Sequence, residues 1–274
     1  MGKFKFDIFW LLVAVSWCNS LAAADQVEDG YVPTVLITGS NRGIGLEFAR
    51  QYAAKNWFVI ATARKPDKAN DLQELAVKFD NVVIEKLDVN DLPGVDALAE
   101  KYADHPVDVL INNAALSGSP SPKQLFGKVD YDRFDLFMKT NVRGPLKVSE
   151  AFSRQLRNSQ FKKLVVISSL AGSFGAGNAT SNGTMVYRTS KAALNMLMLN
   201  VADAVKKYGV SVTLLNPGLV DTQGMLTKMN DKMNLGLKLT LIEDSVSGMI
   251  GVIDSAGMST SGQWFQWSGE PVSF

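Results

Sequence analysis

The stretch TGSNRGIG, Thr38 to Gly45, follows a short apolar run and opens a helical pattern. In a nucleotide-binding α/β domain, the first turn that contacts phosphate stands at this place. Gly39 lets the chain turn sharply out of the strand, Gly43 allows the backbone close to a pyrophosphate, and Gly45 lets helix and sheet approach. Free amides at the helix N-terminus stabilise anions. The stretch predicts a dinucleotide site. Its spacing departs from G-x-G-x-x-G, and a glycine-rich turn that caps a helix is the alternative.

Composition favours one large α/β domain, because 274 residues with 46% hydrophobic and 20% charged side chains can bury a full core. Lys and Arg number 28 against 27 Asp and Glu, so no net field attracts nucleic acid or an anionic membrane. The single cysteine, Cys18, and the single histidine, His105, exclude disulfide frameworks and Cys/His metal sites. No carboxylate cluster has ligand spacing, so no metal is expected.

The N-terminus has the layout of a secretory signal. Lys3 and Lys5 precede an apolar run from Ile8 to Trp17, and small residues end at Ala24. The run is too short for a transmembrane helix of about 20 residues. We therefore predict that residues 1–24 form a signal peptide and that the protein is exported, periplasmic or secreted. The alternatives are a retained N-terminal anchor and a cytoplasmic protein.

From Thr34 onward, short β-branched runs alternate with helical periodicity, which is typical of a parallel sheet covered on both faces. The pattern predicts an α/β, doubly wound domain over residues 33–274 with a seven-stranded parallel sheet. The expected strands are Thr34–Ile37, Phe58–Thr62, Val82–Leu87, Val107–Ile111, Leu164–Ser168, Val210–Leu215 and Gln263–Trp267.

Tyr187 and Lys191 begin a long helical pattern and stand one turn apart on one face. A nearby ammonium favours phenolate, which lowers a tyrosine pKa from roughly 10 towards the range useful for proton transfer. Tyr187 could then donate a proton to a carbonyl oxygen as hydride arrives. The alternative is an ordinary exposed pair on a helix surface. We expect the core-facing stripe of this helix to be Leu194, Leu197, Val201, Ala204 and Tyr208, with Gly209 as its stop.

Further motifs occur in a consistent order: LDV ending at Val89, NNAA at 112–115, KTNVRG around Asn141, ISS ending at Ser169, YRTSK at 187–191 and NPGLVDT at 216–222. With these motifs, the sequence resembles the short-chain dehydrogenase/reductase family from about Pro33 to the C-terminus. The resemblance implies a Rossmann-type fold and an NAD(P)-dependent oxidoreductase acting on CH-OH or C=O groups.

The resemblance also implies roles for four catalytic residues. Tyr187 resembles the general acid/base of the family, and Lys191 the partner that lowers its pKa and binds the ribose. Ser169 resembles the donor that orients the carbonyl, and Asn141 the residue that holds a proton-relay water. A plainer reading of Ser169 is a cap at a strand end.

The cofactor residues are assigned by the same resemblance. Asp88 would meet the adenine edge, Asn113 and Ala114 the adenosine ribose, and Thr222 the nicotinamide carboxamide. The plainer alternatives are a solvated carboxylate for Asp88, a turn former for Asn113 and a helix cap for Thr222. The full expected set is Gly39, Asn41, Arg42, Gly43, Ile44, Gly45, Arg64, Asp88, Val89, Asn113, Ala114, Tyr187, Lys191, Pro217, Gly218, Val220 and Thr222.

The second predicted strand is followed by Ala63 and Arg64, without the acidic residue that bonds a ribose 2′-hydroxyl in NAD sites. Arg42 supplies another cation nearby, and two guanidinium groups suit a 2′-phosphate. We therefore expect NADP(H) to be preferred, with NAD(H) as the alternative. Arg64 and Lys65 could instead belong to a solvated basic surface.

The chain departs from the family pattern at Ala115, where many members have glycine, and in a long segment from Gly172 to Thr184. Sniffer-type carbonyl reductases and C-factor proteins carry a similar insertion, which favours that branch. The stretch 223–241 corresponds to the substrate lid of the family. Its apolar residues are compatible with a small hydrophobic carbonyl or alcohol, or with an ordinary core-facing helix; they are Met225, Leu226, Met229, Met233, Leu235 and Leu237.

Two functions follow from these patterns. The first is an NADP(H)-dependent oxidoreductase that reduces an aldehyde or ketone to an alcohol, with Tyr187 as general acid. The second is a signalling or binding protein like C-factor that retains the cofactor fold. We expect no nucleic-acid partner, a membrane partner only if the N-terminal segment is retained, and a homo-oligomer, a dimer or tetramer.

Overall fold

The computed structural model describes residues 30–117, 120–175, 183–222, 224–234, 236 and 238–274. The predicted signal peptide, residues 1–24, lies outside this part of the chain. Residues Tyr31–Phe274 form one compact unit. None of the described helices combines the length and the hydropathy needed to cross a bilayer.

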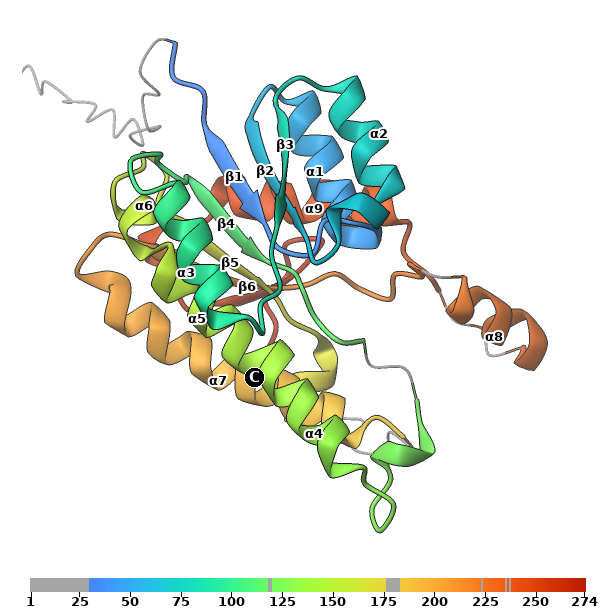
Figure 1. Cartoon of the computed structure of the whole chain (residues 1–274). Coiled ribbons are helices and arrows are strands. Elements are labelled where there is room, and N and C mark those ends of the chain that lie inside the picture. Colours follow the sequence, from blue (N-terminus) through green and yellow to red (C-terminus); the bar gives the residue numbers. More distant parts are fainter. Residues whose placement is uncertain (1–29, 118–119, 176–182, 223, 235, 237) are drawn as a thin grey trace, which may run out of the picture. The chain divides into compact units, whose positions relative to one another are not determined.

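Seven strands in the described residues form one parallel sheet with the order β3-β2-β1-β4-β5-β6-β7 (Figure 1). The seven-stranded parallel sheet predicted from the sequence is confirmed, and the strand ends differ by at most two residues. The strand order reverses between β1 and β4, and ligands of such sheets bind outside the carboxyl ends at this point. The strands are β1 (Thr34–Ile37), β2 (Phe58–Ala63), β3 (Val82–Lys86), β4 (Val109–Asn112), β5 (Lys163–Ile167), β6 (Ser211–Asn216) and β7 (Trp264–Gln266).

Helices cover both faces of the sheet (Figure 1). One hydrophobic core lies against α1 (Gly43–Ala54), α2 (Asn70–Lys78) and α9 (Ile242–Ser255). The other lies against α3 (Leu92–Lys101), α5 (Gly144–Ala151), α6 (Ser153–Arg157) and α7 (Met185–Lys206). Alternation along β1 supplies both cores, because Val35 and Ile37 face the first and Leu36 faces the second.

The remaining elements connect the strands and these helices along the chain. They are α4 (Tyr131–Met138), α8 (Met225–Met233), the π-helical turn η3 (Lys139–Arg143) and the short 3₁₀ turns η1 (Pro66–Lys68), η2 (Pro122–Gln124), η4 (Leu170–Gly172) and η5 (Met258–Thr260). The π-turn joins α4 to α5 without a break. Such turns insert an extra residue into a helix and are frequent at functional sites.

The core-facing stripe expected on α7 is only partly right. Leu194 is buried, but Ala204 and Tyr208 are exposed. Leu197 and Val201 pack against the core as expected, and Met198 and Ala202 are buried beside them. The expected stripe was wrong at Ala204 and Tyr208. Val205 packs against the core in place of Ala204, and Tyr208 lies beyond Lys206, the last residue of α7.

Candidate active site

The glycine-rich turn joins β1 to α1 with little space to spare. Gly39 has a φ of +72°, a left-handed conformation that favours glycine. A Cβ on Gly45 would lie 2.4 Å from the Gly39 carbonyl oxygen and 2.5 Å from the Asn113 side-chain nitrogen. The close approach predicted for Gly45 is therefore present. Arg42 provides no side-chain cap for α1, whose first turn has no acidic residue, so the helix N-terminus keeps the polarity that suits an anion.

A hydrogen-bond network locks this turn to the end of β4. Thr38 Oγ1 accepts the backbone N–H groups of Asn113 and Ala114, both at 3.0 Å. The Asn113 side-chain amide donates to the carbonyl oxygens of Thr38 at 2.9 Å and Gly39 at 3.1 Å. Asn113 thus has a structural role in fixing the shape of the glycine turn.

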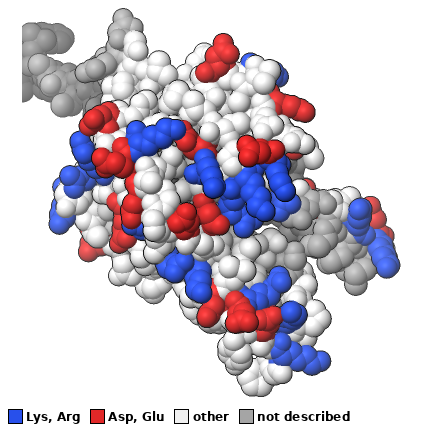
Figure 2. All heavy atoms as spheres, in the orientation of Figure 1, with Lys and Arg blue, Asp and Glu red and all other residues white. Residues whose placement is uncertain are grey.

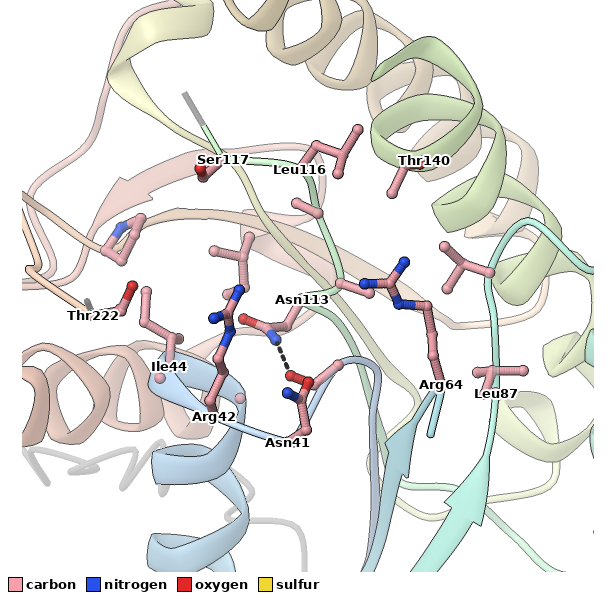
Figure 3. Close-up of a pocket in the computed structure, with 18 of the residues that line it drawn as sticks. Asn41, Arg42, Ile44, Arg64, Leu87, Asn113, Leu116, Ser117, Thr140 and Thr222 are labelled. Atoms are coloured by element: carbon pink, nitrogen blue, oxygen red, sulfur yellow. Dashed lines mark hydrogen bonds between the residues drawn. The ribbon is translucent and has the colours of Figure 1, made fainter. Parts of the chain in front are cut away.

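A pocket of about 450 Å³ lies at the carboxyl edge of the sheet (Figure 3). It gathers residues from the glycine turn, from the ends of β2, β3, β4 and β5, and from α7. Most residues of the predicted cofactor set line it: Gly39, Asn41, Arg42, Gly43, Ile44, Gly45, Arg64, Asp88, Val89, Asn113, Ala114, Tyr187, Lys191, Pro217 and Thr222.

Further residues line the pocket but are not in the expected set; they are Leu87, Asn90, Ala115, Leu116, Ser117, Thr140, Ile167 and Ser168. All of them stand within a predicted motif or within two positions of one. Position next to a motif is the signal that could have identified them.

Two expected cofactor residues do not line this pocket. Gly218 has a φ of +80°, and a Cβ there would lie 2.9 Å from Thr240 and from the Trp267 ring. Val220 forms an isolated parallel bridge with Thr240. In this structure both residues shape the loop after β6.

Tyr187 and Lys191 both reach the pocket from the first turns of α7. Lys191 is buried, and its Nζ donates to the Ile167 carbonyl oxygen at 2.9 Å. The same Nζ lies 5.9 Å from the centre of the Tyr187 ring. The two side chains therefore share one site, as their spacing predicts.

The Tyr187 pKa shifts in the direction opposite to the one expected from its pairing with Lys191. Burial raises the pKa of Tyr187 above its usual value, and a side-chain hydrogen bond with Ser169 offsets this in part. Burial also lowers the pKa of Lys191 to about 8. Removal from water dominates at both groups, so Tyr187 stays a protonated phenol at neutral pH and can donate its proton.

Ser169 and Asn141 do not line the pocket but contact residues that do. Ser169 forms the N-cap of η4 by accepting the Ala171 N–H at 3.2 Å, so the capping role considered from the sequence is present. Ser169 also lowers the pKa of Tyr187, which lines the pocket. Asn141 is fully buried in η3, and its Nδ2 donates to Ser190 Oγ at 3.0 Å.

Arg42 extends from the start of α1 and Arg64 from the end of β2, on either side of Asn113 in Figure 3. Both side chains are exposed, and within the described part of the chain neither takes part in an ion pair. Lys and Arg side chains gather near the carboxyl ends of β2 and β3 in Figure 2. Lys65 follows β2 and Lys86 is the last residue of β3, and both side chains are exposed. This end of the pocket is therefore suited to an anionic group.

The predicted lid, residues 223–241, contains the helix α8. The side chains on which its apolar character depends lie outside the described residues: Met225, Leu226, Met229, Met233, Leu235 and Leu237. The lid stays a prediction.

The family model described as short chain dehydrogenase matches residues 33–234. An uncharacterized oxidoreductase of Schizosaccharomyces pombe is 34% identical over 249 residues, which cover 87% of this chain and 96% of that protein. Among solved structures, the NADPH-bound carbonyl reductase from chicken fatty liver is 30% identical, with a TM-score of 0.75 over 89% of this chain and 99% of its own. The carbonyl reductase Sniffer of D. melanogaster has the same fold, with 23% identity and a TM-score of 0.76 over 89% of this chain and 100% of its own. This chain belongs to the short-chain dehydrogenase family.

Proposed function

We propose that the protein is an NADP(H)-dependent carbonyl reductase that converts an aldehyde or ketone into an alcohol. The observation that carries this proposal is the convergence of Tyr187 and Lys191 on the pocket, with Ser169 near enough to lower the Tyr187 pKa. NADPH, when bound, supplies the hydride that reduces the carbonyl carbon. The phenol of Tyr187 donates its proton to the carbonyl oxygen, so that one hydride and one proton yield the alcohol.

The other side chains support this proton transfer. We propose that Ser169 shares the carbonyl oxygen with Tyr187, because Ser169 is near enough to the phenol to lower its pKa. The Lys191 ammonium stabilises the phenolate that remains after the transfer. Asn141 is proposed, from the family resemblance, to hold a water that returns the proton.

The pocket fits NADP(H) better than NAD(H). The glycine turn and the start of α1 line the pocket, and a Cβ on Gly45 would displace the Gly39 carbonyl oxygen and the Asn113 side chain that shape this turn. At the adjoining end, Arg42 and Arg64 offer two guanidinium groups to the 2′-phosphate. The chicken carbonyl reductase of the same family was solved with NADPH bound. We infer a small hydrophobic carbonyl or alcohol as the substrate, from the apolar residues of the predicted lid.

Purified protein mixed with NADPH and a panel of aldehydes and ketones tests this function, with loss of NADPH absorbance as the readout. The variant Tyr187→Phe should reduce turnover by roughly 10²- to 10⁴-fold, the range of general acid–base catalysis, while NADPH still binds. Tyr208→Phe is the matched control, because Tyr208 follows the same helix and is exposed. Turnover that survives in Tyr187→Phe would overturn the mechanism.

A protein with no reductase activity on the panel would favour the second function, a signalling or binding role that retains the cofactor fold. Comparing a biological activity of the wild type with that of a Tyr187→Phe, Lys191→Ala variant separates the two. Equal activity would support the non-catalytic role.

We further propose export with cleavage after Ala24, and assembly into a dimer or tetramer. Mass spectrometry of the mature protein tests the first proposal: a chain that starts at Asp25 supports cleavage, and an intact Met1 opposes it. Size-exclusion chromatography with light scattering tests the second, since a monomeric mass would overturn it.

A further inference from the structure

Gln124 is a polar side chain that is completely buried, with 0% of its surface exposed. It ends the short turn η2, in the connection between β4 and α4. Its Oε1 accepts the backbone N–H of Tyr187 at 3.0 Å. A residue far away in the sequence thus binds the main chain of the proposed proton donor.

This bond gives a hydrogen-bond partner to a backbone N–H group in the first turn of α7. The first N–H groups of a helix have no partner within the helix, and a side chain of the N-cap residue usually supplies one. Thr184, the N-cap of α7, forms no such bond, and the first intrahelical bond shown here runs from Arg188 N–H to the Thr184 carbonyl oxygen. The side chain of Gln124, from another segment of the chain, therefore caps α7 in place of the Thr184 side chain.

Two neighbouring contacts hold the same junction. The Ser121 N–H donates to the Gly183 carbonyl oxygen at 2.8 Å, just before α7 begins. Gly183 has a φ of +85°, and a Cβ there would lie 2.9 Å from the Ser121 nitrogen. The Phe137 ring of α4 packs edge-on against the Tyr187 ring, with centroids 6.3 Å apart. The η2 segment and α4 thus contact both the entry to α7 and the side chain of Tyr187.

We propose that Gln124 is a positioning residue for the reaction: its side-chain oxygen fixes the backbone at Tyr187 and thereby the place of the phenol in the pocket. The inference rests on the proposed role of Tyr187 as proton donor. Misplacement of a reacting group by about 1 Å costs roughly 100-fold in rate, so an anchor on the main chain of Tyr187 affects kcat directly.

Two variants separate the hydrogen bond from the space that the side chain fills. Gln124→Met keeps a similar volume and removes the acceptor, while Gln124→Glu keeps an oxygen at the same place. Gln155→Met is the matched control, because Gln155 is also buried and also binds a main chain, through Nε2 to the Ala99 carbonyl oxygen at 2.7 Å. For each variant kcat, KM, the pH profile and the dissociation constant of NADPH are measured.

The backbone bond has a readout that does not depend on activity. In protein labelled with [¹⁵N]tyrosine, the Tyr187 amide signal is identified by its absence from Tyr187→Phe. Its exchange with solvent deuterium reports whether the N–H is bonded. We expect faster exchange in Gln124→Met and near wild-type exchange in Gln124→Glu and Gln155→Met.

The expected kinetic result is a fall in kcat of roughly 10- to 100-fold in Gln124→Met, with NADPH binding within about twofold and recovery in Gln124→Glu. Wild-type kcat in Gln124→Met would overturn the inference, as would equal loss in Gln124→Met and Gln124→Glu. If Tyr187→Phe is active, the proposed function itself fails. If Tyr187→Phe is inactive while Gln124→Met is fully active, only the positioning role fails.

Discussion

Asn141 binds the backbone of Leu116 with both polar atoms of its side chain. Its Oδ1 accepts the Leu116 N–H at 2.7 Å, and its Nδ2 donates to the Leu116 carbonyl oxygen at 3.2 Å. Leu116 lines the pocket, whereas Asn141 is fully buried behind it in the π-turn. Asn141 therefore holds one wall of the pocket in place, a role that stands beside the proposed binding of a water.

We predict that Asn141→Ala lowers the free energy of unfolding by roughly 2–3 kcal/mol, because it removes the partner of the half-buried backbone groups of Leu116 and of the buried Ser190 hydroxyl. Urea denaturation measures this change. Asn200→Ala is the control, since Asn200 is exposed and bonds only within its own helix, to the Met196 carbonyl oxygen. Equal stability of Asn141→Ala and the wild type would contradict the structural role.

Lys191 makes stability depend on pH. Burial lowers its pKa to about 8, whereas an unfolded chain has a lysine pKa of about 10.4. Between these values the unfolded chain holds a proton that the folded protein has released, so stability rises with pH. Below pH about 8, Lys191 is protonated in both the folded and the unfolded state, and the free-energy cost of burying its charge is fully present.

The difference in unfolding free energy between the wild type and Lys191→Met should therefore grow in favour of the wild type above pH about 8, by at most about 1.4 kcal/mol per pH unit. Urea denaturation of both proteins without nucleotide, from pH about 7 to about 10, measures it, and subtraction removes the other titrating groups. A difference that does not change with pH would show that Lys191 titrates normally.

The double variant Arg42→Ala, Arg64→Ala should lose roughly 100-fold in NADPH affinity, because two charge-assisted bonds to the 2′-phosphate disappear. NADH affinity should change far less. Isothermal titration with both nucleotides measures the two effects. Lys65→Ala is the matched control, since Lys65 follows Arg64 and is exposed but does not line the pocket. Equal losses for NADPH and NADH would refute the assignment.

Gly45→Ala should abolish dinucleotide binding and destabilise the fold by roughly 1–3 kcal/mol, because its Cβ would meet the Gly39 carbonyl oxygen at 2.4 Å. Thermal unfolding with and without NADPH measures both effects. Gly251→Ala is the matched control: Gly251 lies within α9 with nothing inside 4 Å of a Cβ, so it should be neutral or stabilising by up to about 1 kcal/mol. Normal NADPH binding by Gly45→Ala would contradict the close approach.

The sheet could be predicted because its strands carry a local signal. In β1 and β6 every residue is buried, and such fully buried strands appear in sequence as continuous β-branched or apolar runs. The end of α7 shows the limit of this reasoning. Tyr208 continues the helical period, yet it is 41% exposed and contacts Arg157 instead of the core.

The candidate site, like the fold, could be predicted from the sequence only in part. The motifs predicted which residues meet at the carboxyl edge, and the spacing of Tyr187 and Lys191 predicted that they share a site. The direction of the Tyr187 pKa could not be predicted, because it depends on how much water the folded chain removes from the phenol. The network from Thr38 to Asn113 was also missed, since it joins two segments that meet only in space.

By itself the sequence determined the order of strands and helices along the chain, the glycine turn and the residue types that carry proton transfer, because these depend on local periodicity and on short motifs. Only the tertiary structure decided which backbone each buried polar side chain binds: Asn141 at Leu116, Lys191 at Ile167 and Gln124 at Tyr187. The physical reason is that a polar group removed from water must find its partner among whatever the packing brings near it, and such partners have no fixed separation in sequence.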